Sequence, residues 1–597
     1  MFPRSILRTG LALFPLLAAA QTTVPAEDRA GMPLDWSHLH VIFSQPATED
    51  QFRQLDADPR YSLQTLRRTH PQFAEAAAGF PAATAATAAA DPGRDWSEAI
   101  GTSPYTLSSP TYPAKYSFNV NNPTPSCTSD YVVYTLPVST GPAAFNVIAF
   151  NNLYVNAAGN GLCPGTTPNV LFAYNATQAV GTPSTGPVIS LDGTLIAFVE
   201  KSTAAQFHVL KWHGGDKPTT FPKPFNGTGP LASCVTTNGA APCEYSVAFS
   251  TTTSTLGSPY VDYASDTAYL TDDKGSIYAV SPVFKATPAK PPALVAGYPV
   301  SVSTSRLTAP VYDTVSGNVF VADTSKLLYL RTKATSAGAC LTGVPPCAGK
   351  LNVVMSTGSG IATTLEAPLV DSTNGTVFAF AYSGPPYNGD IVVQSNTTLS
   401  LRNVANISGT IGASTASTIY AGTFNNAYYN NPTSGLLYAC GQDNFGHFGA
   451  LWAVGFSSAT TMKTTAPTGP LTLTTASLSG ASAPCSSLTE VFNQTAGKDF
   501  LYTGVTSKCA FGASATGCLL AFDITSGFPT TAAANFPSNS GTGGIVIDNV
   551  VGSLASATNL YFLTAQPQGG GAPCTVFTGG TNTTGNCAVM LTQSGLH

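Results

Sequence analysis

Short apolar runs separated by polar turns recur along the chain from about residue 115 onward. Each well-formed unit begins with a proline, apolar residues and an aspartate. A turn, an apolar strand, a polar loop and another apolar strand follow. The starting prolines of four units lie 72, 51 and 58 residues apart: Pro187 to Asp192, Pro259 to Asp262, Pro310 to Asp313 and Pro368 to Asp371. Weaker copies follow, with strands expected at 436–439 and 451–454, at 499–502 and 518–522, and at 545–548 and 559–563.

Units of four short strands at this spacing predict an all-β fold, a β-propeller. The second strands, such as Leu195 to Val199, are continuously apolar, as expected for strands that neighbouring blades cover on both faces. Counting Tyr131 to Val180 as the first unit gives eight blades, with seven as the alternative. The last unit ends at Cys587 to Thr592, one strand short. We expect Lys115 to Val120 to supply that strand and close the ring.

The N-terminal part differs from the repeats. Residues 1–20 have the pattern of a cleaved secretory signal peptide: Arg4 and Arg8, an apolar stretch at 11–17, and three alanines. Residues 21–95 are expected to hold two short helices and an Ala/Thr/Pro-rich linker at 74–92. Thr48 with Gln51 predicts one helix start, and Asp58 before Pro59 predicts the other. Residues 96–597 form the predicted propeller domain.

The chain has 12 cysteines, an even number, which in an exported protein predicts disulfides. No metal site is expected, because no Cys-x-x-Cys occurs and His is scarce. The protein is therefore predicted to be secreted or periplasmic. The expected pairs are sequential: Cys127/Cys163, Cys234/Cys243, Cys340/Cys347, Cys440/Cys485, Cys509/Cys518 and Cys574/Cys587.

The charge pattern excludes one class of partner. Only 9 % of the residues are charged and the net charge is −5, without a basic run, so no nucleic-acid partner is expected. No segment after the signal is long and apolar enough to span a membrane in the mature chain.

Cys518 to Gly527 resembles the repeat of quinoprotein-type propellers, an apolar strand followed by Asp and a Thr-Gly-like turn, and Val170 to Asn175 is a weaker version. The unit Ser258 to Asp262 is similar to that of uncharacterised secreted bacterial propeller proteins. The resemblance implies the propeller fold for residues 115–595. Quinoprotein dehydrogenases also have adjacent cysteines and regular tryptophans. This chain has no adjacent cysteines and four Trp, so no cofactor is expected.

Several chemically suggestive residues have a structural interpretation. The repeated aspartates precede turns, where an Asp side chain caps its own backbone, with metal binding at the channel as the alternative: Asp192, Asp262, Asp313, Asp371 and Asp548. Asp272 to Gly275 resembles the start of a calcium loop but lacks its alternating oxygen ligands, so an ordinary turn is expected. His208 and His213 lie five residues apart, on opposite faces of a strand, which predicts packing or capping rather than a shared ligand. No Gly-x-Ser-x-Gly motif of a hydrolase occurs.

The candidate site lies on the propeller face that carries the loops entering each first strand and the loops between second and third strands. These loops are enlarged only in later units, which indicates function rather than the needs of the repeat. Aromatic rings beside amides and carboxylates fit a neutral polar ligand such as a sugar. We therefore predict a module that binds an extracellular glycan or protein and has no catalytic residues. The alternative is an extracellular enzyme, a carbohydrate-active lyase or hydrolase or a degenerate quinoprotein. The predicted ligand-binding residues are Arg306, Glu366, Tyr387, Asn388, Asp390, Gln442, Asp443, Phe445 and His447.

Overall fold

The computed structural model describes residues 32–69 and most of residues 94–592. The predicted signal peptide and linker, Asn388, Phe445 and Cys574 lie outside them. The longer gaps are 70–93, 101–106, 108–110, 118–125, 139–144, 156–161, 217–230, 356–365, 408–418, 479–482, 512–516, 550–557 and 567–585.

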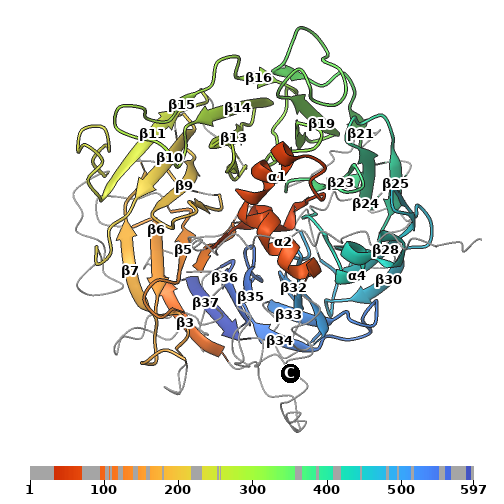
Figure 1. Cartoon of the computed structure of the whole chain (residues 1–597). Helices are drawn as coiled ribbons and strands as arrows, with labels where there is room; N and C mark the ends of the chain where they lie inside the picture. The colour runs from red at the N-terminus through yellow and green to blue at the C-terminus, as the bar shows by residue number, and fades with distance from the viewer. Residues whose placement is uncertain are drawn as a thin grey trace, which may run out of the picture.

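Eight antiparallel sheets surround one axis, so the predicted eight-bladed β-propeller is confirmed (Figure 1). The strands of seven blades run outward in chain order, and blade 8 takes its outer strand from the N-terminal part of the chain. In blades 3, 4 and 6 two short strands share the outermost position. The first four blades are β4–β7 (Ala114–Ser117, Tyr131–Thr135, Val147–Asn151, Asn169–Tyr174), β8–β11 (Val188–Ile189, Leu195–Glu200, Gln206–Lys211, Cys243–Ala248), β12–β16 (Tyr260–Asp262, Thr267–Thr271, Ser276–Ser281, Ala293–Leu294, Val300–Ser301) and β17–β21 (Val311–Asp313, Asn318–Ala322, Lys326–Arg331, Cys347–Ala348, Val353–Val354).

The other four blades follow the same plan. Blade 6 also holds a short helix α4 (Asn426–Asn430) and a 3₁₀ turn η3 (Pro432–Ser434) between its first two strands. These blades are β22–β25 (Leu369–Asp371, Thr376–Ser383, Gly389–Asn396, Asn403–Asn406), β26–β30 (Thr423–Phe424, Leu436–Gln442, Gly449–Ser458, Thr461–Met462, Thr468–Thr472), β31–β34 (Thr489–Asn493, Lys498–Val505, Cys518–Asp523, Ala534–Pro537) and β35–β37 (Val546–Asn549, Thr558–Leu563, Asn586–Thr592) with β3 (Arg94–Ile100).

The continuously apolar second strands are buried as predicted. Every residue of β18 and of β23 is buried, because the neighbouring blades cover both faces of these strands. Outer strands are different: both residues of β15 are exposed. The core is therefore a set of apolar layers between blades.

The ring is closed by an N-terminal strand, but the expected strand is wrong. β3 pairs with β37 from Trp96 opposite Met590 to Ile100 opposite Asn586 and completes blade 8. Ala114–Ser117 is instead β4, the first strand of blade 1. Pro113 precedes it as Pro187 precedes β8, so this segment begins a unit rather than ending one. β3 contains several polar residues, which an outer strand tolerates. A search for apolar runs therefore did not identify it as a strand.

Residues 32–43 cross the centre of the ring. β1 (Met32–Leu34) pairs antiparallel with β4 of blade 1, and β2 (Val41–Ile42) pairs parallel with β22 of blade 5. The 3₁₀ turn η1 (Trp36–Leu39) joins them. Because blades 1 and 5 are opposite in a ring of eight, the segment spans the channel.

Helices α1 (Glu49–Asp56) and α2 (Pro59–Thr69) follow and lie over the centre of the ring (Figure 1). Both predicted helix starts are confirmed. The Thr48 hydroxyl accepts a hydrogen bond from the Gln51 N–H, and α2 begins at Pro59 directly after Asp58. The helices cover the face that holds the turns between first and second strands, hereafter the turn face. The opposite face, which carries the predicted site loops, is the entry face.

Five predicted disulfides are present: Cys127–Cys163, Cys234–Cys243, Cys340–Cys347, Cys440–Cys485 and Cys509–Cys518. Cys587 is also disulfide-bonded, but its predicted partner Cys574 is not described. No helix among the described residues is long and apolar enough to cross a membrane.

Candidate functional site

The predicted site loops join the second and third strands of blades 5 and 6. Asp390 lies in β24 after the first loop, and Gln442 ends β27 before the second loop. The buried Asp390 carboxylate accepts a 2.9 Å hydrogen bond from the backbone N–H of Gln442. Gly441 allows this approach, since a Cβ there would lie 2.7 Å from the carboxylate oxygen. The structure therefore joins Asp390 and Gln442 across the blade boundary.

The Gln442 side chain lies beneath the second loop. Its Oε1 is 3.2 Å from His447 Nδ1, while its Nε2 is buried without a hydrogen-bond partner among the described residues. The oxygen and nitrogen of the amide can exchange places. In either orientation one end of the amide has no partner among these residues. Such a buried polar atom is normally satisfied by a water or a ligand.

The backbone of the second loop holds His447 in place. His447 has a φ of +60°, which few residues other than glycine adopt. Its carbonyl accepts the Leu478 N–H over 2.9 Å. The Asp443 carboxylate accepts the Phe448 N–H over 3.2 Å, so it closes the loop. His447 and Asp443 are both half-buried.

Tyr387 in the first loop is half-buried. The Arg402 guanidinium lies over its ring, 5.8 Å from the centroid. The Tyr387 carbonyl accepts a 3.1 Å hydrogen bond from the Asn406 amide, which fixes the loop to β25. Arg402 was not among the predicted residues, because it lies on the other side of β24 in sequence.

Glu366 lies where the chain enters β22, near the axis, and is fully buried. It contacts His40 Nε2 at 3.3 Å, and it accepts hydrogen bonds from the Tyr112 hydroxyl, the Ser487 hydroxyl and the Ala421 N–H. Burial alone would raise the pKa of Glu366, but the hydrogen bond and charge of His40 and the two hydroxyls lower it. Glu366 thus links the crossing segment to three other parts of the ring.

Arg306 makes its ion pair with blade 3 rather than with the other predicted residues. It precedes β17 of blade 4 and pairs with Asp273 through Nε at 2.8 Å and Nη2 at 2.9 Å. Its side chain is 48 % exposed. This ion pair joins the loop between β13 and β14 of blade 3 to the segment that precedes β17 of blade 4.

Arg60 was missed by sequence reasoning, although it fills the centre of the molecule. Its guanidinium pairs with Asp58 at 2.6 Å, donates to the Val261 carbonyl at 2.8 Å, and lies 4.3 Å from the Tyr260 ring centroid. It is fully buried. Only the three-dimensional path of α2 reveals its position. The turn-face end of the channel is thus occupied by the chain itself.

A second buried charge cluster lies within blade 2. His208 Nε2 is 2.7 Å from Glu200, and its Nδ1 is 3.2 Å from Glu244 and 3.0 Å from the Ser246 hydroxyl. Burial opposes protonation, but the two carboxylates outweigh it and raise the pKa of His208 to about 9. The charged imidazolium is held between two acids. The predicted packing role of His208 is confirmed, but its partners come from adjacent strands that no sequence spacing indicates.

Four of the five repeated aspartates take the predicted capping role; Asp548 is buried and pairs with Lys115 Nζ at 2.7 Å, and the turn after it lies outside the described residues. His213 lies apart from His208, 3.3 Å from Asp216. Asp313 accepts the N–H groups of Val315 and Ser316, and Asp371 accepts those of Thr373 and Asn374. Asp192, Asp262 and Asp272 cap their turns in the same way.

No protein-family model matches the chain. No curated protein sequence matches it. Among solved structures, Sqt1 from Saccharomyces cerevisiae is 7 % identical, with 84 % of this chain and 99 % of that chain covered and a TM-score of 0.42. Sqt1 from Chaetomium thermophilum is 12 % identical, with 80 % and 96 % covered and a TM-score of 0.38. A luciferin-regenerating enzyme is 10 % identical, with 56 % and 89 % covered and a TM-score of 0.26. These likenesses carry no argument about function.

Proposed function

We propose that this protein is an exported binding module that takes a neutral glycan at the entry face of blades 5 and 6. The observation that carries the proposal is the buried Gln442 amide with one unpartnered end beneath the His447 loop. An amide end at such a position suits a sugar hydroxyl, which both donates and accepts hydrogen bonds.

The arrangement of the chain favours this face. The two helices cover the turn face and the crossing segment fills the channel, whereas the site loops lie at the face opposite the helices. The five disulfides fit an oxidising compartment outside the cytoplasm. A rigid ring with variable loops is a scaffold on which binding sites commonly reside.

The proposed contacts divide by side-chain chemistry. Tyr387 and His447 present rings on which a sugar can stack, and the Gln442 amide bonds its hydroxyls. Asn388 and Phe445 belong to the same two loops and complete the proposed contact set. Asp390 and Asp443 fix the loops. Glu366 and Arg306 are left out of the contact set because each already has its protein partners.

The test is a glycan array probed with the full mature chain, followed by titration of the retained glycan. Gln442→Leu keeps the side-chain size but removes the amide, so affinity should fall about tenfold, the value of one hydrogen bond to a ligand. His447→Asn, which tolerates a positive φ, should also weaken binding. The matched control is His213→Ala, an exposed histidine on blade 2, which should leave binding unchanged.

Three results would count against the proposal. If the array retains no glycan, or if the Gln442 and His447 variants bind as tightly as the parent chain, the proposed binding site is wrong. Capture of a defined extracellular protein by these loops in place of a glycan would keep the site and replace the ligand. Shortening of the bound glycan would support the enzyme alternative.

A further inference from the structure

Basic residues are concentrated in blades 3 to 5. Of the 25 Lys and Arg residues in the chain, nine lie between residues 274 and 402, against five of the 30 Asp and Glu residues. This stretch has a formal charge of +4, whereas the rest of the chain, with 16 basic and 25 acidic residues, has −9. With the adjacent Asp272 and Asp273 included, residues 272–402 still carry a formal charge of +2, so basic residues are concentrated in this part of the chain.

The acidic residues of this stretch do not balance the surface charge. All five are buried: Asp313, Asp323, Glu366, Asp371 and Asp390. Most of the basic residues are exposed. Five of them lie in or beside the third and fourth strands of blades 3 to 5 and form no ion pair with a described residue. We call this surface the basic rim: Lys285, Lys290, Lys333, Lys350 and Arg402.

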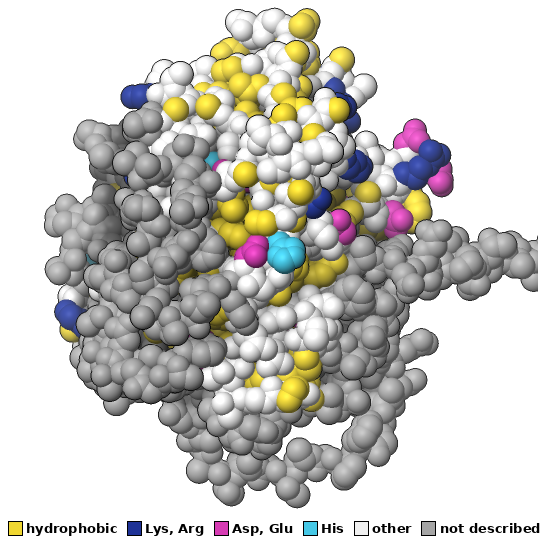
Figure 2. Space-filling view, turned by 90° about the vertical axis from the view of Figure 1, so that its left-hand side faces the viewer, with side chains coloured by type: hydrophobic (Ala, Val, Ile, Leu, Met, Phe, Trp, Pro, Cys, Tyr) yellow, Lys and Arg dark blue, Asp and Glu magenta, His cyan; other side chains and the backbone are white. Residues whose placement is uncertain are grey.

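The same rim exposes aliphatic side chains. Val344 is 80 % exposed and Leu341 is 62 % exposed, the two highest values among the large hydrophobic residues described. Leu294, Leu351 and Leu401 are also exposed on these blades. Figure 2 shows hydrophobic side chains with Lys and Arg among them at the upper end of the molecule, where blades 3 and 4 lie in Figure 1.

Val344 and Leu341 are presented by a braced loop between β19 and β20. The Cys340–Cys347 disulfide closes the loop. Arg331 donates to the carbonyls of Ser336 and Ala334 at its base. A braced loop loses little conformational entropy when it binds. Val344 and Leu341 can therefore insert into an apolar phase at a small entropic cost.

The three blades form one continuous rim. Gly297 of blade 3 lies against Pro346 of blade 4, to which a Cβ on Gly297 would come within 2.9 Å. Arg402 of blade 5 donates through Nε to the Val354 carbonyl of blade 4 at 2.7 Å. Cations and aliphatic groups on all three blades can therefore meet one extended surface.

We propose that the basic rim docks on an anionic lipid membrane, with Val344 and Leu341 entering the headgroup region and the rim cations binding lipid phosphates. Charge complementarity selects a negative partner, and each Lys or Arg near an anionic leaflet adds attraction. The aliphatic groups select lipid over an acidic polysaccharide, which offers nothing apolar for them to enter. The attachment is peripheral and needs no membrane-spanning segment.

The experiment is flotation of the full mature chain with vesicles. The lipids are phosphatidylcholine alone or phosphatidylcholine mixed with phosphatidylglycerol. The protein should float with the mixed vesicles at low salt, and high salt should release most of it. Lys333→Glu with Lys350→Glu should lower the partition coefficient at least about tenfold. Val344→Asp should lower it as well.

Blade 2 supplies matched controls. Val235 is 48 % exposed beside the Cys234–Cys243 disulfide, and Lys201 is exposed on the same blade. Val235→Asp and Lys201→Glu should leave flotation unchanged. Lack of flotation by the parent chain, equal binding to both vesicle types, or equal loss in the controls would overturn the proposal. Glycan titration of the same variants keeps this outcome separate from the function proposed above.

Discussion

Two N-terminal pieces join the ring in different ways. β3 adds a seven-residue strand to blade 8 by backbone pairing. The segment 32–69 contributes strands of only three and two residues, and side chains hold it: Trp36 donates to the Pro259 carbonyl, Arg60 lies among aromatic rings, and His40 contacts Glu366. The first piece closes the ring, and the second fills the channel. Closure therefore depends on strand pairing, and filling depends on a few buried polar groups.

The largest expected effect comes from removing β3. A chain lacking residues 21–93 should remain a soluble monomer of reduced stability, because the ring stays closed. A chain lacking residues 21–100 should aggregate, because β37 becomes an open edge strand. Size-exclusion chromatography and light scattering distinguish the two. Equal solubility of both truncations would show that pairing with β3 does not close the ring.

Substitution of Arg60 should have the next largest effect. Arg60→Met keeps much of the side-chain volume but leaves Asp58 buried without its cation, at a cost of about 3–5 kcal/mol in unfolding free energy. Denaturant unfolding followed by tryptophan fluorescence measures this loss. Arg53→Met on the exposed surface of α1 is the control and should change stability by less than about 0.5 kcal/mol. A small loss in Arg60→Met would mean that apolar packing holds the segment.

Blade 2 offers a further test of how much a buried ionic group stabilises the fold. His208 lies within one blade, whereas Arg60 and His40 lie between the N-terminal segment and the ring. The folded pKa of His208, about 9, exceeds the ordinary value of 6.5. The contribution of His208 to the unfolding free energy should therefore be complete below pH 6.5 and be lost as the pH rises through 9. A shift of this size corresponds to at most about 3 kcal/mol.

His208→Gln should remove that pH dependence. Unfolding free energies of both chains, measured from pH 6 to pH 10, should converge at alkaline pH. His213→Gln, with an exposed imidazole, is the control and should keep the parent slope. Parallel curves for the parent and His208→Gln would contradict a stabilising imidazolium.

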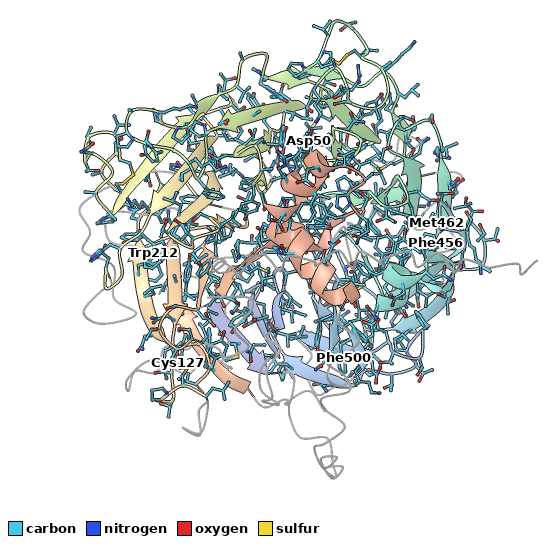
Figure 3. The ribbon with its side chains drawn as sticks, in the orientation of Figure 1. Asp50, Cys127, Trp212, Phe456, Met462 and Phe500 are labelled. Carbon is cyan, nitrogen blue, oxygen red and sulfur yellow. A yellow bond between two sulfur atoms is a disulfide. The ribbon has the colours of Figure 1, made fainter. Side chains whose placement is uncertain are left out.

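The sequence predicted what depends on local pattern. Prolines, aspartates and apolar runs indicated the blades, and cysteine order indicated the five observed pairs. Side-chain contacts were harder to predict, because ring closure brings the first and last blades together: in Figure 3, Cys127 of blade 1 and Phe500 of blade 7 both lie in the lower half of the ring, with blade 8 between them. Glu366 meets partners from residues 40, 112, 421 and 487, a meeting that only ring closure creates. β3 was missed because an outer strand needs no apolar pattern.

The smallest expected effect lies in an exposed turn of blade 2. Asp192 accepts the Thr194 N–H at 3.0 Å and hydroxyls of Ser190 and Thr194, and it is exposed. Asp192→Ala should cost about 1 kcal/mol, the value of a lost cap.

At the equivalent position in blade 5, Asp371 is buried and also accepts the Tyr428 hydroxyl at 2.8 Å, and its turn contacts the segment because Thr373 donates to the Phe43 carbonyl. Asp371→Ala should therefore cost about 2–3 kcal/mol, because it leaves a buried hydroxyl unpaired. Asn at either position keeps an acceptor for the turn and should recover part of each loss. Thermal unfolding of the four variants measures the difference. Equal losses of unfolding free energy at the two sites would mean that residues 32–43 and Tyr428 do not stabilise the Asp371 turn. Arg60 and Glu366 would then be the polar groups that hold the N-terminal segment in the channel.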